Sequence, residues 1–404
     1  MNVRRAIVSV MAASALVVLP IGHVPDASPS ATVGPSLRAV RAADAFLDAY
    51  LTADGRVIRR DQGSDTVSEG QAYAMVLAVA IGDEARFRLA WTWTTSHLQR
   101  PDGLLAWRWQ QGRVVDPGAA SDADLLTAWA LGLAGARFTD AGLTRDAKRM
   151  AHSVVMLETI DVHPGRILVA GPWATTASQP PVNPSYFVTP AMSQLWWITA
   201  DAAWAGIATS ARRALTTGTA NAPHLPADWT TVDGSAAAAP NGTGERFSYD
   251  AARVIVQQAV DCDPAGRAIA VRSWPFFAAL AEDRIGAVYA LDGTRVGTDR
   301  HPITLVAAAA AAHAAGDESA ARLLDEASAL DATHPTYYGS AWIALGRIWL
   351  DTPLLGGCGR AMPHRAADQS GVDRSGVDGQ AVTGTEDSTQ PSSVGLVSKL
   401  VISA

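Results

Sequence analysis

The sequence predicts an all-α protein whose helices can close into a double ring, and three observations lead to this prediction. Apolar residues between about 33 and 365 recur at helical spacing and mark about a dozen helices. Many of these helices are joined by very short turns, such as Gly82-Asp83 and Gly316-Asp317, which produce antiparallel helical hairpins. Of the 404 residues, 48% are hydrophobic, so the chain can bury a large core.

Successive hairpins of this kind place six helices in an inner ring and six in an outer one. Alternate helices then run parallel, so all even-numbered helices begin at the same end of the ring. The segment 104–115 is the exception to the helical pattern, because its alternating Leu-Leu-Ala-Trp-Arg-Trp predicts a small β-hairpin. The expected helices span residues 36–52, 67–81, 83–98, 121–136, 140–158, 189–200, 201–217, 248–260, 264–284, 302–315, 317–331 and 339–350.

The two ends of the chain differ in composition from the body. Arg4 and Arg5 precede an apolar stretch at 6–20 that is short for a membrane span, so residues 1–31 are expected to be a secretory signal segment and the protein to be secreted. An uncleaved membrane anchor is the alternative. Residues 33–365 are expected to form one domain, and residues 366–404 a disordered low-complexity tail.

Composition excludes several classes of partner. The net charge is −7 and no cluster of Lys and Arg is present, so no binding to nucleic acid is expected. Cys262 and Cys358 fit no metal-binding spacing, so we expect neither a metal nor a cofactor. In an oxidising compartment these cysteines can form a disulfide, or they can remain two separate buried thiols. The 13 Trp residues outnumber both Phe and Tyr, and such an excess suits stacking against sugar rings.

Carboxylates stand at the starts of three even-numbered helices. Glu69 lies in the first turn of the second helix, Asp122 and Asp124 open the fourth, and Asp250 opens the eighth. Arg253 follows Asp250 at the same-face spacing of a helix, and its charge favours the ionised form of that carboxyl group. Because these helices begin at one end of the ring, the carboxylates are expected to converge at one mouth as an active site.

The starts of the second and fourth helices also suggest a side-chain cap and a metal site. Ser68 or Thr66 is expected to cap the helix that carries Glu69. The Asp-x-Asp spacing at 122–124 can also hold a divalent metal with a diphosphate, although no further ligand or basic phosphate clamp supports that interpretation.

Six segments of the chain resemble glycoside hydrolase family 8, which contains endo-β-1,4-glucanases. The similarity lies in the run VSEGQAYAMVLAVAIGDEARFRLAWTWTTSHLQRPDGLLAWRW, in ASDADLLTAWAL at 120–131, in Asn-Pro-Ser-Tyr at 183–186, in Leu-Pro-Ala-Asp-Trp at 225–229, in Tyr-Asp-Ala-x-Arg at 249–253 and in Tyr-Tyr-Gly-Ser at 337–340. These motifs follow one another in the expected order across most of residues 36–350.

The resemblance implies an (α/α)6 barrel and hydrolysis of internal β-1,4 bonds of a glucan such as cellulose, with inversion at the anomeric carbon. On the family pattern Glu69 is the proton donor, Asp250 the base that activates water, and Asp122 the residue that holds and distorts the sugar. Residues that match or adjoin the motifs are expected to contact substrate, and these are Tyr73, Trp107, Asp124, Tyr186, Tyr249, Arg253 and Tyr338.

The proposed chemistry makes demands on these groups. Glu69 must have a raised pKa although a helix N-terminus lowers it, so burial or a neighbouring carboxylate such as Asp122 has to dominate. Trp107 is the preferred sugar platform, since its hairpin leads to Asp122 and places Trp109 on the same face. The other candidate platforms, each equally consistent with core packing, are Trp91, Trp93, Trp129 and Trp173.

Departures from the family pattern leave the substrate open. Val256 and Gln257 stand where a Trp is common, and Ala72 and Ala74 stand where glycines are common. Xylan or chitosan could replace glucan on the same fold. A non-catalytic glucan-binding toroid that assists polysaccharide export, or a lyase, are further alternatives, although a lyase needs basic residues that the motifs lack. We expect a monomer whose partner is a β-1,4-linked polysaccharide and which binds no membrane after signal removal.

Overall fold

A computed structural model describes residues 37–163, 165–355 and 357–358, all within one compact unit that begins at Pro35. The expected signal segment, 1–31, and tail, 366–404, lie outside the described residues. The α-helices are α1 Leu37–Tyr50, α2 Ser68–Ile81, α3 Glu84–His97, α4 Ser121–Arg137, α5 Ala141–Leu157, α6 Thr189–Thr199, α7 Ala203–Gly218, α8 Tyr249–Ala259, α9 Pro264–Ala278, α10 Pro302–Ala315, α11 Ser319–Thr333 and α12 Tyr337–Asp351.

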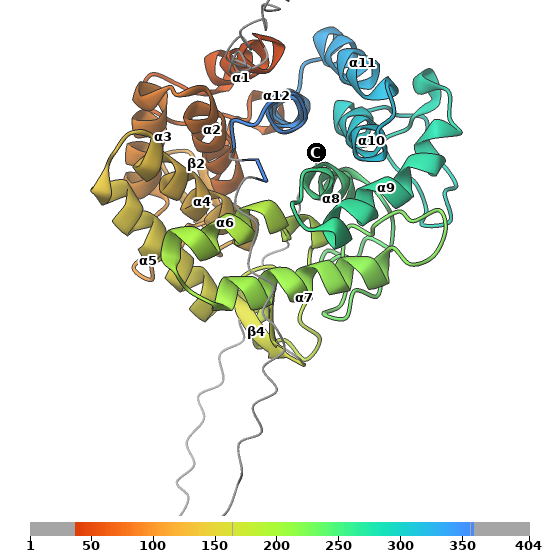
Figure 1. The fold of residues 1–404 in the computed structure, drawn as a ribbon. Coiled ribbons are helices and arrows are strands. Elements are labelled where there is room, and N and C mark those ends of the chain that lie inside the picture. The colour runs from red at the N-terminus through yellow and green to blue at the C-terminus, as the bar shows by residue number, and fades with distance from the viewer. Residues whose placement is uncertain (1–36, 164, 356, 359–404) are drawn as a thin grey trace, which may run out of the picture. The chain divides into compact units, whose positions relative to one another are not determined.

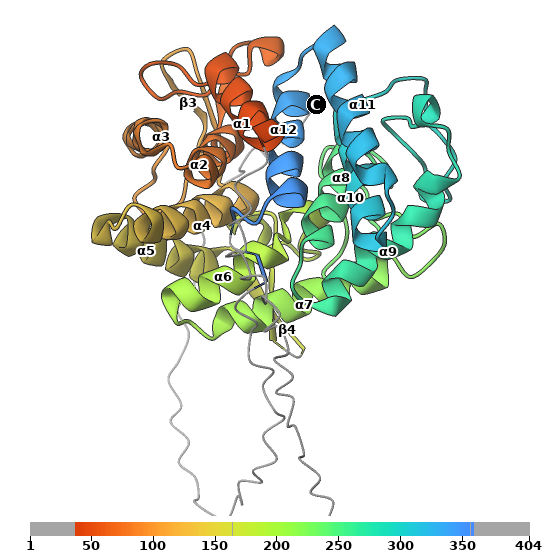
Figure 2. The same cartoon turned by 45° about the horizontal axis from the view of Figure 1, so that its top comes forward.

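These helices form two concentric rings (Figures 1 and 2). Each even-numbered helix contacts the next even-numbered one, and α12 packs back against α2 to close the inner ring. The odd-numbered helices pack around the outside, and each contacts at least one of the inner helices beside it in the chain. The predicted double ring is therefore confirmed.

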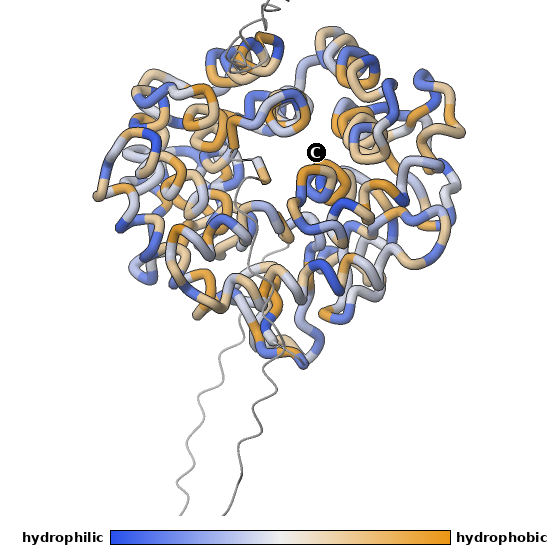
Figure 3. Tube along the Cα trace, viewed as in Figure 1, coloured by the Kyte–Doolittle hydropathy of each residue, from blue (hydrophilic) through white to orange (hydrophobic). Residues whose placement is uncertain are grey.

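Burial separates the two rings. The inner helix α10 is buried without interruption from Pro302 to Ala312, and its run of alanines lets neighbouring helices approach closely. The outer helix α1 buries only Ala39, Ala43, Phe46, Leu47 and Tyr50, which is the single stripe of a surface helix. Hydrophobic and hydrophilic residues accordingly alternate around the outer helices in Figure 3.

The connections at the two ends of the ring differ in length. Inner helices lead into outer ones through short turns at 82–83, 138–140, 200–202, 260–263 and 316–318. Outer helices lead back to inner ones mostly through longer segments, at 51–67, 98–120, 158–188, 219–248 and 279–301. We call the end with the long segments the mouth and the end with the short turns the base.

The strands lie in these long segments. β1 (Thr66–Val67), β2 (Arg108–Gln110) and β3 (Arg113–Asp116) form an antiparallel sheet, so the predicted hairpin exists but its pairing begins at Arg108. A second hairpin, β4 (Thr159–Val162) with β5 (Gly165–Leu168), was not predicted. It directly follows α5, whose helical pattern the prediction extended to 158.

Some helix ends differ from the prediction for local reasons. α9 ends at Ala278 instead of 284, soon after Pro275, and residues 282–284 form a separate 3-10 turn. α12 begins two residues earlier than predicted, since the Thr336 hydroxyl accepts a hydrogen bond from Gly339 N at 3.0 Å. The expected cap of α2 is wrong, because residue Val67 occupies the cap position and no side chain caps this helix.

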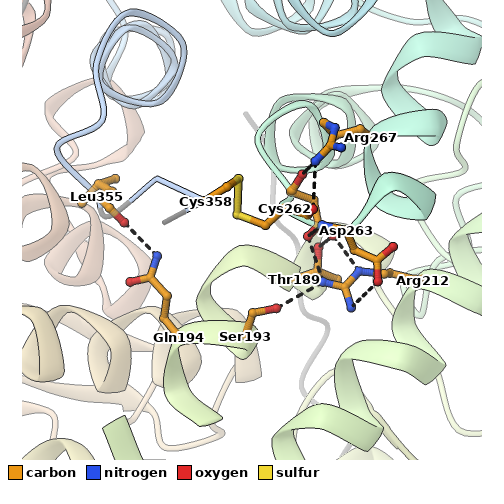
Figure 4. Close-up of a disulfide and its surroundings, with 10 residues drawn as sticks. Thr189, Ser193, Gln194, Arg212, Cys262, Asp263, Arg267, Leu355 and Cys358 are labelled. Carbon is orange, nitrogen blue, oxygen red and sulfur yellow. Dashed lines mark hydrogen bonds and ion pairs between the residues drawn. A yellow bond between two sulfur atoms is a disulfide. The ribbon is translucent and has the colours of Figure 1, made fainter. Parts of the chain in front are cut away.

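A disulfide ties the segment after α12 to the base of the ring (Figure 4). Cys358 pairs with Cys262, which follows α8, and their Cα atoms are 5.2 Å apart. Gln194 on α6 donates a hydrogen bond to Leu355 O at 2.8 Å. Of the two possibilities for the cysteines, the structure has the disulfide, and the segment thereby links α12, α8 and α6.

Candidate active site

Arg253 on α8 gathers the carboxylates from three inner helices. Its Nη1 donates to Glu69 Oε2 at 3.0 Å, to Asp122 Oδ2 at 3.0 Å and to Tyr73 Oη at 3.1 Å. Its Nη2 donates to Asp250 Oδ1 at 2.8 Å. The starts of α2, α4 and α8 therefore meet at the mouth, as the alternation of helices predicts.

Charge is unbalanced around this arginine. The side chains of Glu69 and Asp250 are 12% and 11% exposed, whereas that of Asp122 is 3% exposed. One buried guanidinium thus faces three carboxylates, and only two of the three reach the solvent to an appreciable degree. Such a cluster is most stable when one carboxyl group keeps its proton.

Glu69 is the carboxyl group that holds the proton. Burial raises its pKa to about 7, Arg253 opposes this rise, and the negative charge of Asp122 adds to it. The Tyr337 hydroxyl lies 3.4 Å from Glu69 Oε1 and can orient that oxygen. At neutral pH a large fraction of Glu69 is therefore available as a proton donor.

Asp250 is held from both sides by donors. Arg253 binds Oδ1, and Asn183 Nδ2 donates to Oδ2 at 2.9 Å. The amide of Asn183 is itself oriented, because its Oδ1 accepts from the Ser185 N–H at 3.1 Å and the Ser185 hydroxyl at 2.6 Å. Two fixed donors stabilise an ionised carboxylate at this position.

Asp122 and Asp124 have different surroundings although they lie two residues apart. Asp122 faces Arg253, and burial raises its pKa against the effect of that cation. Asp124 is fully buried, and its Oδ1 accepts from Leu105 N at 2.8 Å. Burial raises the pKa of Asp124 and of the neighbouring buried Glu158 well above their ordinary values. The structure therefore places Asp124 beneath the mouth, beside Glu158 and not among the carboxylates that Arg253 binds.

Three of the expected tyrosines surround Arg253 or its partners. Arg253 lies over the Tyr186 ring at 5.5 Å from its centroid, and Tyr73 accepts a hydrogen bond from the guanidinium. The Tyr338 hydroxyl donates to Tyr249 O at 3.2 Å. Burial raises the pKa of Tyr73, Tyr186 and Tyr338 well above the ordinary value, so these hydroxyl groups stay protonated.

Tyr249 stands beside a histidine that the sequence reasoning did not single out. Its half-buried ring packs edge-on against His301, with ring centroids 5.0 Å apart. Burial lowers the pKa of His301 to about 4, so this imidazole is neutral at physiological pH. His301 Nδ1 accepts a hydrogen bond from Ile303 N at 3.2 Å and so helps to begin α10.

The sequence reasoning also missed Asn183, Tyr337 and Asp228 as functional residues. All three lie in motifs that carry the family resemblance, namely those at 183–186, 337–340 and 225–229. The motifs themselves were the available signal, but neither spacing nor residue type indicated which side chain reaches the carboxylates.

The candidate tryptophans separate into different environments. Trp107 is almost buried and packs on Val67 and Ala120, the residues that precede α2 and α4. Trp109 instead packs edge-on against Trp93 at 5.4 Å and lies under Arg56. The two indole rings therefore pack in different environments.

Trp173 is the candidate platform with the most accessible ring. It is 38% exposed, and its indole N–H donates to Ala119 O at 3.2 Å, two residues before α4 begins. Trp129 lies in the core, where its ring packs near Trp349 with centroids 6.5 Å apart. Trp91 is partly buried against the core.

Two further properties concern the part of the chain that the structure describes. Its His, Cys, Asp and Glu side chains form no group that could hold a metal ion. None of its helices combines the length and apolar character that crossing a bilayer requires.

A closed ring of hairpins with a carboxylate cluster at its mouth defines the class of helical-barrel enzymes that act on carbohydrates. The sequence profile of glycosyl hydrolases family 8 matches residues 21–351. The chain therefore belongs to this family, which confirms the resemblance stated from the motifs.

Individual relatives agree with this assignment. The chain is 36% identical over 216 residues to a probable endoglucanase of Novacetimonas hansenii and 29% identical over 212 residues to an endoglucanase of Cellulomonas uda. These alignments cover 52% and 51% of this chain but only 63% and 59% of those two relatives.

Solved structures extend the similarity over most of the barrel. The endo-beta-1,4-glucanase CMCax of Acetobacter xylinum superposes with a TM-score of 0.66 at 31% identity, covering 77% of this chain and 97% of that one. An endoglucanase of Komagataeibacter sucrofermentans superposes with a TM-score of 0.66 at 30% identity, covering 77% of this chain and 96% of that one.

Proposed function

We propose that this protein is an inverting endo-β-1,4-glucanase that cleaves a cellulose-like glucan. The observation that carries the proposal is the cluster in which one guanidinium holds Glu69, Asp122 and Asp250. Family membership and the endoglucanases among its relatives support the substrate class.

In the proposed mechanism the two outer carboxyl groups act in opposite protonation states. Glu69 donates its proton to the glycosidic oxygen as the bond to the leaving sugar breaks. Asp250 removes a proton from the water that attacks the anomeric carbon from the other face. Sharing one arginine keeps these groups near each other without a direct hydrogen bond, which is compatible with the roughly 6.5–9.5 Å separation that leaves room for a water.

Asp122 and the aromatic residues provide the binding part of the site. Asp122 is nearly buried, and its Oδ1 accepts from Ala123 N at 2.8 Å while its Oδ2 binds Arg253. The remaining lone pairs of these oxygens can accept a hydroxyl group of the sugar beside the cut. Trp173 presents an exposed ring close to the start of α4 and can stack against a sugar further along the groove. An extended glucan makes use of both kinds of contact.

We also infer that the protein works outside the cytoplasm. The Cys262–Cys358 disulfide supports this, because such bonds persist in oxidising compartments. The arginines and apolar run at the N-terminus support it from the sequence.

The test compares wild type with Glu69→Gln and Asp250→Asn on a soluble β-1,4-glucan, measured as release of reducing ends. Each variant is expected to lose about 100- to 10,000-fold in kcat while it still binds the polymer, since general acid–base catalysis contributes about that much. Glu318→Gln and Asp233→Asn serve as matched controls, because both side chains are exposed and lie outside the cluster.

Product chemistry discriminates between the alternatives. Inversion of a β bond yields the α-anomer first, which proton NMR detects before mutarotation. A β-anomer as first product contradicts the proposed mechanism, and an unsaturated end that absorbs ultraviolet light indicates a lyase. Binding of the polymer without release of any reducing end indicates the non-catalytic toroid.

A further inference from the structure

The helix that carries Asp250 is capped by a residue far from it in sequence. α8 begins after Ser248, whose side chain makes no capping hydrogen bond. Instead Asp228 Oδ1 accepts from Ser248 N at 2.9 Å and from Ala251 N at 3.0 Å. The first-turn N–H groups of a helix have no partner within the helix, and a capping box normally satisfies this pair through residues of the helix itself. Here one carboxylate binds both.

Asp228 is itself firmly held. Its Oδ2 accepts from the Ser248 hydroxyl and from Arg246 Nε at 3.3 Å, and its backbone N–H donates to Arg246 O at 2.8 Å. The side chain is almost buried. Residue 228 and the first turn of α8 therefore move as one unit.

The cap and the base lie beside each other. Asp250 is located between the two residues whose N–H groups Asp228 binds, and both carboxylates line one pocket together with Tyr249 and Tyr338. Arg246 is the cation that faces Asp228. Burial first, and the charge of Asp250 second, raise the pKa of Asp228 to about 6. The two carboxylates therefore repel each other at neutral pH.

Arg253 and Asn183 bind the two oxygens of Asp250 and so orient its carboxyl group. Asp228 contacts neither of these donors and instead holds the backbone that carries Asp250.

We propose that Asp228 is a positioning residue for hydrolysis: it fixes the first turn of α8 so that Asp250 meets the attacking water. This inference rests on the proposed role of Asp250 as the base. Asp228 acts through the backbone of α8, and it does not itself contact the reacting atoms.

The experiment measures kcat and KM for Asp228→Asn and Asp228→Ala across the pH range. The asparagine keeps an acceptor oxygen for the two N–H groups of α8, so it is expected to keep kcat at the optimum within about threefold of wild type. The alanine removes the cap as well, so kcat is expected to fall about 10- to 100-fold while KM changes by less than about threefold.

Asp140 provides a matched control. It caps the outer helix α5 by accepting from Gly142 N at 2.7 Å, and it pairs with Arg88 at 2.9 Å. Asp140→Ala and Asp140→Asn are expected to lower the melting temperature without changing kcat or KM.

The outcomes separate the two proposals. If Asp228→Ala lowers the melting temperature but keeps the wild-type kcat, Asp228 is merely structural and the inference is overturned. If the alanine variant does not fold, a loss of more than tenfold in kcat for a folded Asp228→Asn, which keeps the acceptor oxygen, overturns it. If Asp250→Asn turns over substrate normally, the proposed function fails first, whatever the Asp228 variants do.

Discussion

One arginine determines the electrostatics of the site. Arg253 offers a single positive charge to three carboxylates, and the burial of the cluster makes the remaining repulsion costly. Glu69 relieves it by keeping a proton up to a pH of about 7. Burial first, and the excess of negative charge around one cation second, therefore keep the proton on the proposed acid in spite of the helix start at which Glu69 lies.

Asp122→Asn tests this origin of the acid. The substitution removes a negative charge that raises the pKa of Glu69, so Glu69 is expected to lose its proton at lower pH. The alkaline limb of kcat, expected near pH 7 in the wild type, should then move downwards, as a pH profile of kcat would measure. An alkaline limb that stays in place or moves upwards would show that Asp122 does not contribute to the protonation of Glu69.

Single residues were predictable where they begin a regular element. Glu69, Asp122 and Asp250 converge because each stands at a helix start, and helix starts follow from apolar periodicity. Asn183 and Asp228 reach the site from irregular segments, where no period fixes the direction of a side chain. Asp124 was predicted to contact substrate, but it stands two residues after Asp122 on the same helix. Its side chain therefore lies in the core and not at the mouth.

At the scale of elements, the packing of α12 against α2 places Tyr337 over Glu69. This contact requires a glycine, because a Cβ added at Gly70 would lie 2.8 Å from the Tyr337 hydroxyl. The first turn of α2 therefore holds Glu69, the proposed acid, next to a glycine that leaves room for the Tyr337 side chain.

Gly70→Ala is expected to displace Tyr337 from Glu69 and to reduce kcat by about tenfold, since small errors in the placement of a catalytic group are costly. Gly206→Ala is the matched control, because Gly206 also lies within a helix and nothing lies within 4 Å of an added Cβ. The control should keep wild-type kcat and gain up to about 1 kcal/mol in stability, as measured by denaturant unfolding. Equal kcat in both variants would contradict the role given to this contact.

Helices were predicted more accurately than the segments between them. Each of the twelve predicted helices corresponds to an α-helix in the part of the chain that the structure describes. The prediction succeeds because every helix must bury an apolar stripe against its neighbours. The β4–β5 hairpin and the early end of α9 were missed because short strands and 3-10 turns carry little periodic signal.

At the scale of the whole molecule, the barrel is closed by the packing of α12 on α2 and is further tied by a covalent bond. The Cys262–Cys358 disulfide spans 96 residues of sequence and fastens the end of the barrel to α8 at the base. The short turns predicted the ring, but the pairing of the cysteines depends on where the segment after α12 runs, which no local pattern reveals.

Cys262→Ser with Cys358→Ser is expected to reduce the free energy of unfolding by at most about 4–5 kcal/mol, the loop-closure value for a loop of this length. Thermal unfolding with and without a thiol reductant measures the effect. The reductant should lower the melting temperature of the wild type to that of the variant and leave the variant unchanged. Wild type that melts at the same temperature in both conditions would contradict a stabilising disulfide.

The long segments at the mouth tolerate sequence changes that the short turns at the base do not. Under the proposed function, insertions and substitutions in the segments 158–188 or 219–248 can lengthen, block or redirect the path of a polymer, because these segments supply Asn183 and Asp228 beside Asp250. The compact turns at the opposite end hold neighbouring helices in register and leave little room for such drift. A barrel of this design can therefore acquire a new polysaccharide through changes at one end while the other preserves the architecture.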